Sequence, residues 1–384
     1  MNNQVVDNKP KVRKESKNKI KVDFERTPLK ERLKAKFLNM FFLKKVVWAI
    51  VRYVLLIGIA YIVLFPFFSK IAASFMAKQD FTDAAVKLIP KHFTIDMYKE
   101  LWIEQKYVQA FVNTFTLSFT TALIQTFICS FIAYGFAKFK FKGNKLWFML
   151  VLLTMIIPHR TLANAIWQTF QHFDIFGIFG FLNGGGFNPF RIFNYKASSL
   201  AVFDIIPDTA AFKMFEAGGI NMLNTYWPFV VLSLTGLAFK NGLYIFLLRQ
   251  FFMGVPDELE ESAYIDGSGV FKTFFTIILP ISIPMMITVF LFSFSWCWTD
   301  DFYTSSSMFF PGRTAPELLT SALNITDSNM PSTLKDQKYM VIAPYVTAIK
   351  NTAGLMIIAP LVVMYAFCQK FLVQGIERSG LTAD

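Results

Sequence analysis

The sequence predicts an all-α polytopic membrane protein with about six transmembrane helices. Hydrophobic residues make up 54% of its 384 positions, and the 46 Phe exceed the usage of a soluble domain. A helix that crosses the hydrocarbon core of a bilayer needs about 20 apolar residues. The chain has about six such stretches, at residues 46–68, 111–136, 146–170, 227–248, 278–298 and 341–371.

The N-terminal arm, residues 1–45, carries much of the net charge of +12. About fourteen Lys and Arg lie between Lys9 and Lys45, directly before the first apolar stretch. We interpret the arm as a cytoplasmic segment held to anionic lipid headgroups, and not as a nucleic-acid-binding segment. No small-residue cleavage site follows, so the first stretch is expected to be a retained helix. Few apolar residues precede Leu33, which favours disorder over residues 1–25.

The distribution of charge predicts the topology. Six spans return both termini to one side, and the basic arm assigns that side to the cytoplasm. We expect a transmembrane domain at 46–372, a cytoplasmic loop at 250–280 between spans four and five, and a cytoplasmic tail at 373–384. The basic residues of the second connection and the tail then also lie inside: Lys138, Lys140, Lys142, Lys145, Lys370 and Arg378.

The loop 250–280 is expected to fold as an elbow of two short helices. Pro256 and the acidic run that follows it suit a helix N-terminus, and we expect this helix over about 256–266. Gly267 and Gly269 allow positive φ, so the chain can turn there into a second helix. The small side chains around Ser262 can seat in a partner's groove while nearby carboxylates pair with its basic groups. The alternative is an interfacial helix that binds nothing.

The loop carries a motif. Glu261-Ser262-Ala263, Gly267 and Ile277-Ile278-Leu279-Pro280 spell E-x-A-x3-G-x9-I-x-L-P, which resembles the cytoplasmic signature of the permease subunits of ABC importers. The run from Glu258 to Gly267 is similar to their carbohydrate branch. Segments on both sides are also similar to that family, at 134–143, 156–158, 223–225, 246–252 and 369–376.

The resemblance implies a role and partners. It implies an import subunit of the bacterial inner membrane that pairs with a second permease and docks on a cytoplasmic ABC ATPase dimer. The solute it implies is a carbohydrate, expected to be an oligosaccharide, delivered by an extracellular binding protein. ATP and Mg would bind to the ATPase, and this chain would be no enzyme and hold no cofactor. The residues implied for ATPase coupling are Glu260, Glu261, Ser262, Ala263, Asp266, Gly267, Leu279 and Pro280.

The sequence departs from the family pattern at two places. Ser262 replaces a usual Ala, which is a change between small residues. An insertion at about 173–219 has no counterpart in the usual short connection between spans three and four. It is either a loop that caps the extracellular face or an extra docking surface for the binding protein.

Two groups of residues are candidates for the substrate path. Pro158 and Arg160 fall within or near the outer hydrocarbon of the third span, where an ionisable side chain is tolerated mainly beside a cavity or another helix. Amide and aromatic groups at helical spacing suit a sugar, although Arg and Trp are also ordinary headgroup anchors. The candidates are Arg160, Asn164, Trp167 and Gln168 in the third span, and Trp296, Trp298 and Asp300 at the end of the fifth, where Trp could instead belong to the aromatic belt.

Other chemistries find little support. The segment 267–273 lacks the Gly that a phosphate loop needs before Lys272. The three His and three Cys are scattered without ligand spacing, and each Cys falls in or beside an apolar stretch. A stand-alone secondary transporter or channel remains the alternative function, but it would need an internal repeat and intramembrane charges, and neither is evident.

Overall fold

The structure is a computed structural model that describes residues 40–174, 220–312, 315–326, 328–331, 333–334 and 343–378. Within these residues it is helical, with two isolated β-bridges and no strand, so the prediction of an all-α protein is confirmed. The chain divides into two units, Met1–Phe67 and Phe68–Asp384. The arm before residue 40, most of the predicted insertion and the end of the tail lie outside the described residues.

The described part of the first unit is helix α2, Met40–Ser74, which continues past the boundary of that unit. Its stretch Lys44–Ser74 is long and apolar enough to cross a membrane. Apolar side chains follow one another on all sides of the helix, which is typical of a membrane span. The first predicted span is therefore present as one continuous helix.

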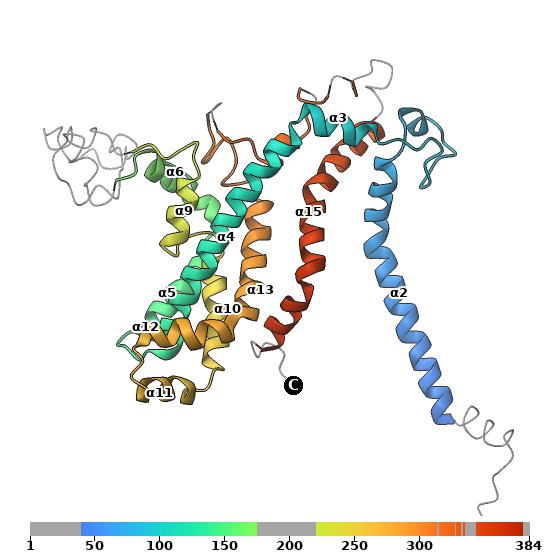
Figure 1. Ribbon diagram of the computed structural model, residues 1–384. Coiled ribbons are helices and arrows are strands. Elements are labelled where there is room, and N and C mark those ends of the chain that lie inside the picture. The colour runs from blue at the N-terminus through green and yellow to red at the C-terminus, as the bar shows by residue number, and fades with distance from the viewer. Residues whose placement is uncertain are drawn as a thin grey trace, which may run out of the picture. The chain divides into compact units, whose positions relative to one another are not determined.

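The second unit is built around helix α4, Tyr107–Lys138 (Figure 1). Helix α4 packs against α9, α10 and α13, and α13 packs in turn against α15, Ala343–Arg378. The buried face of α4 carries mainly small residues, which allow close approach of neighbouring helices in a membrane. They are Ala110, Thr114, Ser118, Thr121, Ala122, Thr126, Cys129, Ser130 and Ala133.

Two of the predicted spans are broken. The third, 146–170, is divided at Pro158 into α5, Asn144–Ile156, and a second arm, His159–Gln171, that is bent from it by 92°. That arm contains a 3₁₀ turn and helix α6, Ala163–Gln171. Proline removes a backbone donor and clashes with the preceding turn, which explains the bend.

The fourth predicted span, 227–248, is two helices, α9, Trp227–Leu234, and α10, Asn241–Met253. Gly236 and Lys240 between them have positive φ, which ends one helix and begins the next. The described residues therefore contain four helices that could cross a membrane, or five if α5 and the arm after it count as one span.

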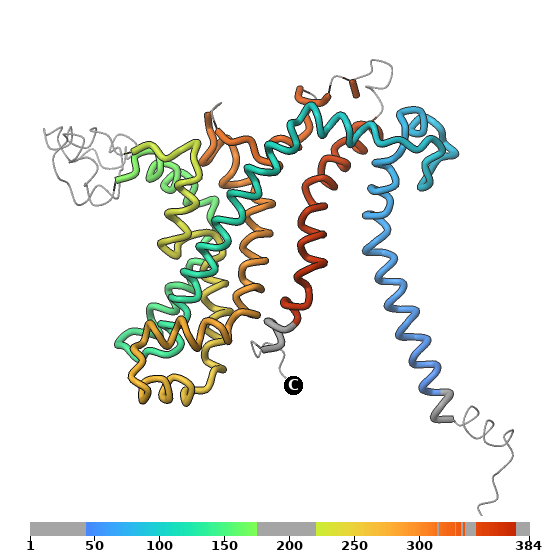
Figure 2. Tube along the Cα trace, viewed as in Figure 1, coloured from blue at the N-terminus to red at the C-terminus, as the bar shows by residue number. Residues whose placement is uncertain are grey.

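Short helices lie at both ends of the second unit. Helix α3, Asp96–Glu104, contacts α4 and α15 at one end, and α11, Glu258–Ile265, lies at the other (Figure 1). Helix α12, Val270–Thr273, follows α11 and continues through a π-helical segment, Phe274–Ile278, into α13, Leu279–Trp298. The Cα trace crosses the lower end of the unit before it bends into the long part of α13 (Figure 2). The π segment and the prolines of α13 explain this bend.

Candidate functional site

Helix α11 ends in a hydrogen-bonded glycine turn. Gly267 has a φ of 79°, as its predicted role requires. Its N–H donates to the carbonyl of Tyr264 at 3.0 Å, and the N–H of Ser268 donates to the carbonyl of Ala263 at 2.9 Å. These two bonds form a Schellman motif, which fixes the direction of the chain after the helix. The prediction of positive φ is wrong for Gly269. This glycine is the N-cap of α12, and its φ of −77° is accessible to any residue.

The inner side of α11 is fastened to the end of α4 through Lys138. The Lys138 ammonium donates to Asp257 Oδ1 and to the carbonyl of Val255, both at 2.6 Å, and lies 3.6 Å from Glu260 Oε1. Tyr134 donates from its hydroxyl to the other Glu260 oxygen at 3.3 Å. The hydrogen bond from Lys138 also lowers the pKa of Asp257. The Glu260 carboxylate is therefore paired within the chain.

The outer side of α11 carries most of the other predicted coupling residues. Glu260 and Ala263 are buried, whereas Glu261, Ser262, Asp266 and Gly267 are exposed. Ile265 stands 86% exposed among them. A large apolar side chain surrounded by small and acidic groups is typical of a surface that another protein covers. We call Glu261, Ser262, Ile265, Asp266 and Gly267 the elbow patch.

Leu279 and Pro280 lie away from the elbow patch, at the start of α13. Leu279 is half-buried and packs beside the core around α10, and Pro280 is exposed. The two residues close the motif in sequence, but the structure assigns them to the bend between the π segment and α13 and not to α11.

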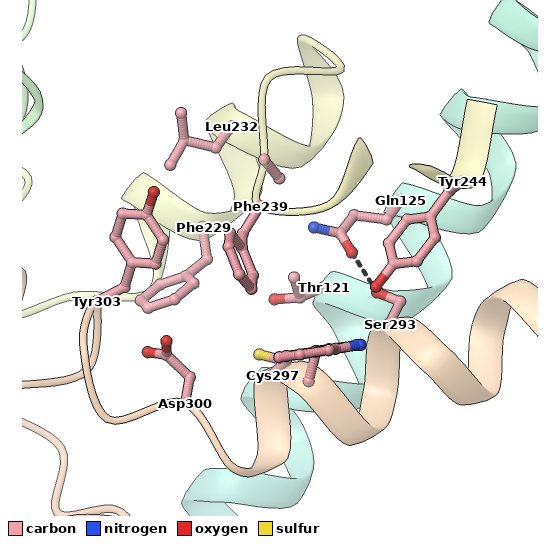
Figure 3. A pocket seen from close by; sticks show the side chains of 12 residues that line it. Thr121, Gln125, Phe229, Leu232, Phe239, Tyr244, Ser293, Cys297, Asp300 and Tyr303 are labelled. Atoms are coloured by element: carbon pink, nitrogen blue, oxygen red, sulfur yellow. Dashed lines mark hydrogen bonds between the residues drawn. The ribbon is translucent and has the colours of Figure 1, made fainter. Parts of the chain in front are cut away.

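A cavity lies where α4, α9, α10 and α13 meet (Figure 3). Its volume, measured as the space open to the centre of a water-sized sphere, is about 40 Å³. One water needs roughly 10–15 Å³ on that measure, so the cavity has room for a few waters but not for a sugar ring. It is lined by Thr121, Gln125, Phe229, Leu232, Ala238, Phe239, Tyr244, Ser293, Trp296, Cys297, Asp300 and Tyr303.

Polar groups from different helices face one another in this cavity. Ser293 of α13 is hydrogen-bonded to Gln125 of α4, as the dashed line in Figure 3 shows. Asp300 accepts a hydrogen bond from the N–H of Thr304 at 2.8 Å, and burial raises the pKa of its carboxyl to about 6. A polar stripe inside an otherwise apolar span is typical of a path for a solute or an ion. Thr121 and Gln125, four residues apart in the second predicted span, carried this signal in the sequence.

The predicted path residues separate into two groups. Trp296 and Asp300 line the cavity, and Arg160 lines a second pocket beside it. Trp298 is buried and donates from Nε1 to the carbonyl of Ile357 at 2.9 Å, which joins α13 to α15. Trp167 packs on a cluster of buried residues around Phe170 and Phe309. Asn164 is exposed and Gln168 half-buried on the same helix, beyond the bend at Pro158, so the predicted face does not run on from α5.

The second pocket lies between the two helix breaks and has a volume of about 390 Å³ on the same measure. The break at Pro158 contributes His159 and Arg160, and the break before α10 contributes Lys240 and Asn241. Ala238 and Phe239 line both this pocket and the smaller cavity. Sequence reasoning missed Lys240, although a lone Lys inside a predicted span is a signal for such a site.

The three cysteines are free. Cys129 is buried, and Cys297 and Cys368 are half-buried. Within the described ranges, no group of three or more His, Cys, Asp or Glu residues is placed to hold a metal ion.

An all-α membrane unit with an exposed elbow between two spans and a polar cavity among its helices has the features of a transport permease. The chain belongs to the family described as binding-protein-dependent transport system inner membrane component, whose model matches residues 125–378, more than half of the chain. The predicted resemblance is confirmed.

Curated relatives span nearly the whole chain. The chain is 27% identical over 331 residues to the galactooligosaccharides transport system permease protein GanQ of Bacillus subtilis (strain 168), covering 85% of this chain and 93% of that protein. It is 25% identical over 327 residues to the polygalacturonan/rhamnogalacturonan transport system permease protein YtcP of the same organism, covering 84% and 94%.

The fold is also known from a solved structure. A chain in the crystal structure of a bacterial ABC transporter that imports the acidic polysaccharide alginate matches with a TM-score of 0.56. The identity is 18%, and the match covers 85% of this chain and 97% of that one. This likeness shows that the two chains share a fold.

Proposed function

We propose that this permease imports a carbohydrate, delivered by an extracellular binding protein, with energy from a cytoplasmic ABC ATPase dimer. A second, similar permease would complete the membrane channel, and ATP and Mg would bind to the ATPase. The observation that carries this proposal is the elbow patch, an exposed apolar and acidic surface on a short helix between two membrane helices. The printed names of the two curated relatives support a saccharide as the solute.

The proposed topology keeps six spans. The pair α9–α10 would be a fourth, discontinuous span, which membrane proteins tolerate where the broken backbone lines a cavity. Both termini and α11 would lie in the cytoplasm of a bacterial cell, with the basic arm 1–45 beside anionic headgroups. The domain boundaries follow at 46–372 and 373–384, and the insertion at 173–219 would lie outside, as a cap or as a docking surface for the binding protein.

The proposed coupling runs through the contacts of α11. The ATPase would hold the elbow patch, while the Lys138 contacts tie the other side of α11 to α4. Movement of the ATPase on ATP binding would then pull on α4 and, through the π segment, on α13. A ligand shifts such an equilibrium only by binding one state more tightly than the other, so closure of the ATPase dimer must favour one arrangement of the spans.

The proposed solute path passes the polar cavity. At about 40 Å³ this cavity is closed to a sugar, so the path would open in another state of the cycle. Gln125, Trp296 and Asp300 offer the directional hydrogen bonds and the aromatic plate that recognise a sugar.

The test is ATP-dependent uptake in proteoliposomes that contain the chain and the partners encoded beside it. We expect Glu261→Lys and Gly267→Asp to abolish uptake and release the ATPase in a detergent pull-down, while the second permease stays bound. Glu317→Lys, the same charge reversal on the loop after α13, is the matched control. Normal uptake by both elbow variants would refute the coupling role. Purification as a lone homo-oligomer would favour a secondary transporter or channel instead.

A further inference from the structure

The two helix breaks are packed directly against each other. A Cβ added at Gly242, in the first turn of α10, would lie 2.8 Å from Met155 Cγ and 2.9 Å from the carbonyl oxygen of Val151, both on α5. The first turn of α10 therefore touches the last turns of α5. Residues from both breaks line the pocket of about 390 Å³ that remains beside this contact. Its volume falls in the range of about 300–1,000 Å³ that is usual for small-molecule sites.

The basic side chains of the pocket lie against aromatic rings. The Lys240 ammonium lies 4.6 Å from the ring centre of Phe239 and 4.7 Å from that of Trp296. The Arg160 guanidinium lies 5.7 Å from the ring centre of Phe302. His159 joins the two sides, because its Nδ1 is 2.6 Å from the Tyr303 hydroxyl and its ring meets Phe239 edge to face.

Arg160 and Lys240 carry charges that no described carboxylate neutralises. In the part of the chain that the structure describes, neither side chain forms an ion pair with a carboxylate. Cation–π contacts hold them in place but leave the ammonium and guanidinium donors available. Charged groups at breaks in membrane spans commonly face a cavity and mark the path of a substrate.

The N-terminus of α10, like the two cations, favours an anionic ligand. This helix is 13 residues long, and its first N–H groups and its dipole favour a negative charge. Asn241, its first residue, is 1% exposed and lines the pocket, and both polar atoms of its side-chain amide lack a hydrogen-bond partner among the described residues. Buried amides are nearly always hydrogen-bonded, so this one is suited to a ligand.

The charges around the two adjoining cavities do not balance. Asp300 is the single carboxylate among the described residues that line them, and it accepts from the Thr304 N–H and not from the two cations. We infer that the pocket between the helix breaks binds a carboxylate of the transported saccharide, as carried by a uronic acid residue. Arg160 and Lys240 would bind the carboxylate. This inference rests on the proposed function and names its solute more closely.

The test is direct binding to the permease pair with its ATPase, purified in nanodiscs. Trigalacturonate and neutral galactotriose are titrated in turn and the heat is measured. We expect trigalacturonate to bind at least about tenfold more tightly, because hydrogen bonds to charged groups are roughly this strong. Lys240→Met and Arg160→Gln should each weaken trigalacturonate binding and so remove most of this preference. Lys240→Arg should keep the preference, and Lys99→Met on α3 is the control for loss of one Lys.

Three results of the binding experiment would overturn the inference. They are equal affinities for the two sugars, no binding of either, and loss of the second permease from the Lys240→Met complex, which would mean that the cations pair with that subunit. Uptake of galactotriose but not of trigalacturonate would sink this inference and leave the proposed function standing. Absence of ATP-dependent uptake of any saccharide would count against the proposed function itself.

Discussion

Lys138 and Lys240 lie at two turning points of the same unit and are used in opposite ways. At the elbow, the Lys138 side chain is 6% exposed, and its ammonium lies beside the carboxylates of Asp257 and Glu260. At the helix breaks, Lys240 rests on two aromatic rings without a described carboxylate partner. A charge that is paired inside the chain fixes geometry, whereas a charge held ready beside a cavity recognises a ligand.

The comparison distinguishes two kinds of residue in the α11 motif: those that hold the helix in position and those that are exposed for recognition. Glu260 and Ala263 lie on the buried side of α11, and the elbow patch is exposed. Around the two helix breaks the arrangement is the reverse. There, aromatic side chains hold the charged side chains in place, and the charges face the pocket. Each of the following changes acts on one region and spares the other.

The largest effect is expected from Lys138→Met. The change leaves the buried Glu260 carboxylate without its cation, and breaking a buried pair in this way costs about 3–5 kcal/mol. We expect a marked fall in the thermal stability of the purified protein and loss of ATPase binding. The double variant Lys138→Met with Glu260→Met should recover part of the stability. A single variant as stable as the parent would show that the elbow is not fastened by this charge.

A smaller effect is expected where α10 meets α5. Gly242→Ala adds a methyl group into contact with Thr154, Met155 and the backbone of Val151, and overpacking of this kind costs about 1–3 kcal/mol. Gly354→Ala on α15 is the matched control, because its Cβ would meet nothing within 4 Å. We expect a lower melting temperature for the first variant alone, together with weaker binding of trigalacturonate. Equal melting temperatures would mean that the breaks are not packed as described.

The smallest effect is expected from Asp300→Asn and depends on pH. Burial raises the pKa of the folded-state carboxyl from 3.8 to about 6, so ionisation above that pH weakens the folded state. The parent should therefore gain stability as pH falls from 7 toward 4, and the Asn variant should not. At pH 8 we expect the variant to melt about 2–4 °C higher, which corresponds to about 1 kcal/mol. Identical pH profiles of the two proteins would contradict the raised pKa of Asp300.

The sequence predicted the parts of this account that depend on local patterns. Composition and apolar length identified the long helices α2, α4, α13 and α15, and Gly267 predicted the turn after α11. The break before α10 was missed, because Thr235–Lys240 keeps enough apolar residues to read as a continuous span. The sequence also did not predict that the Glu260 side chain points into the protein, since this direction depends on Lys138, more than a hundred residues away in the sequence.

The most direct test of the central claim is a photo-cross-link from the elbow patch. A benzoylphenylalanine is placed at Ile265, 86% exposed on α11, or at Trp102, 50% exposed on α3 at the other end of the unit. After irradiation of membranes that hold the assembled transporter, we predict a product between position 265 and the ATPase and none from position 102. An assembled transporter in which position 265 yields no ATPase product, or yields no more than position 102, would contradict the assignment of α11 as the coupling helix.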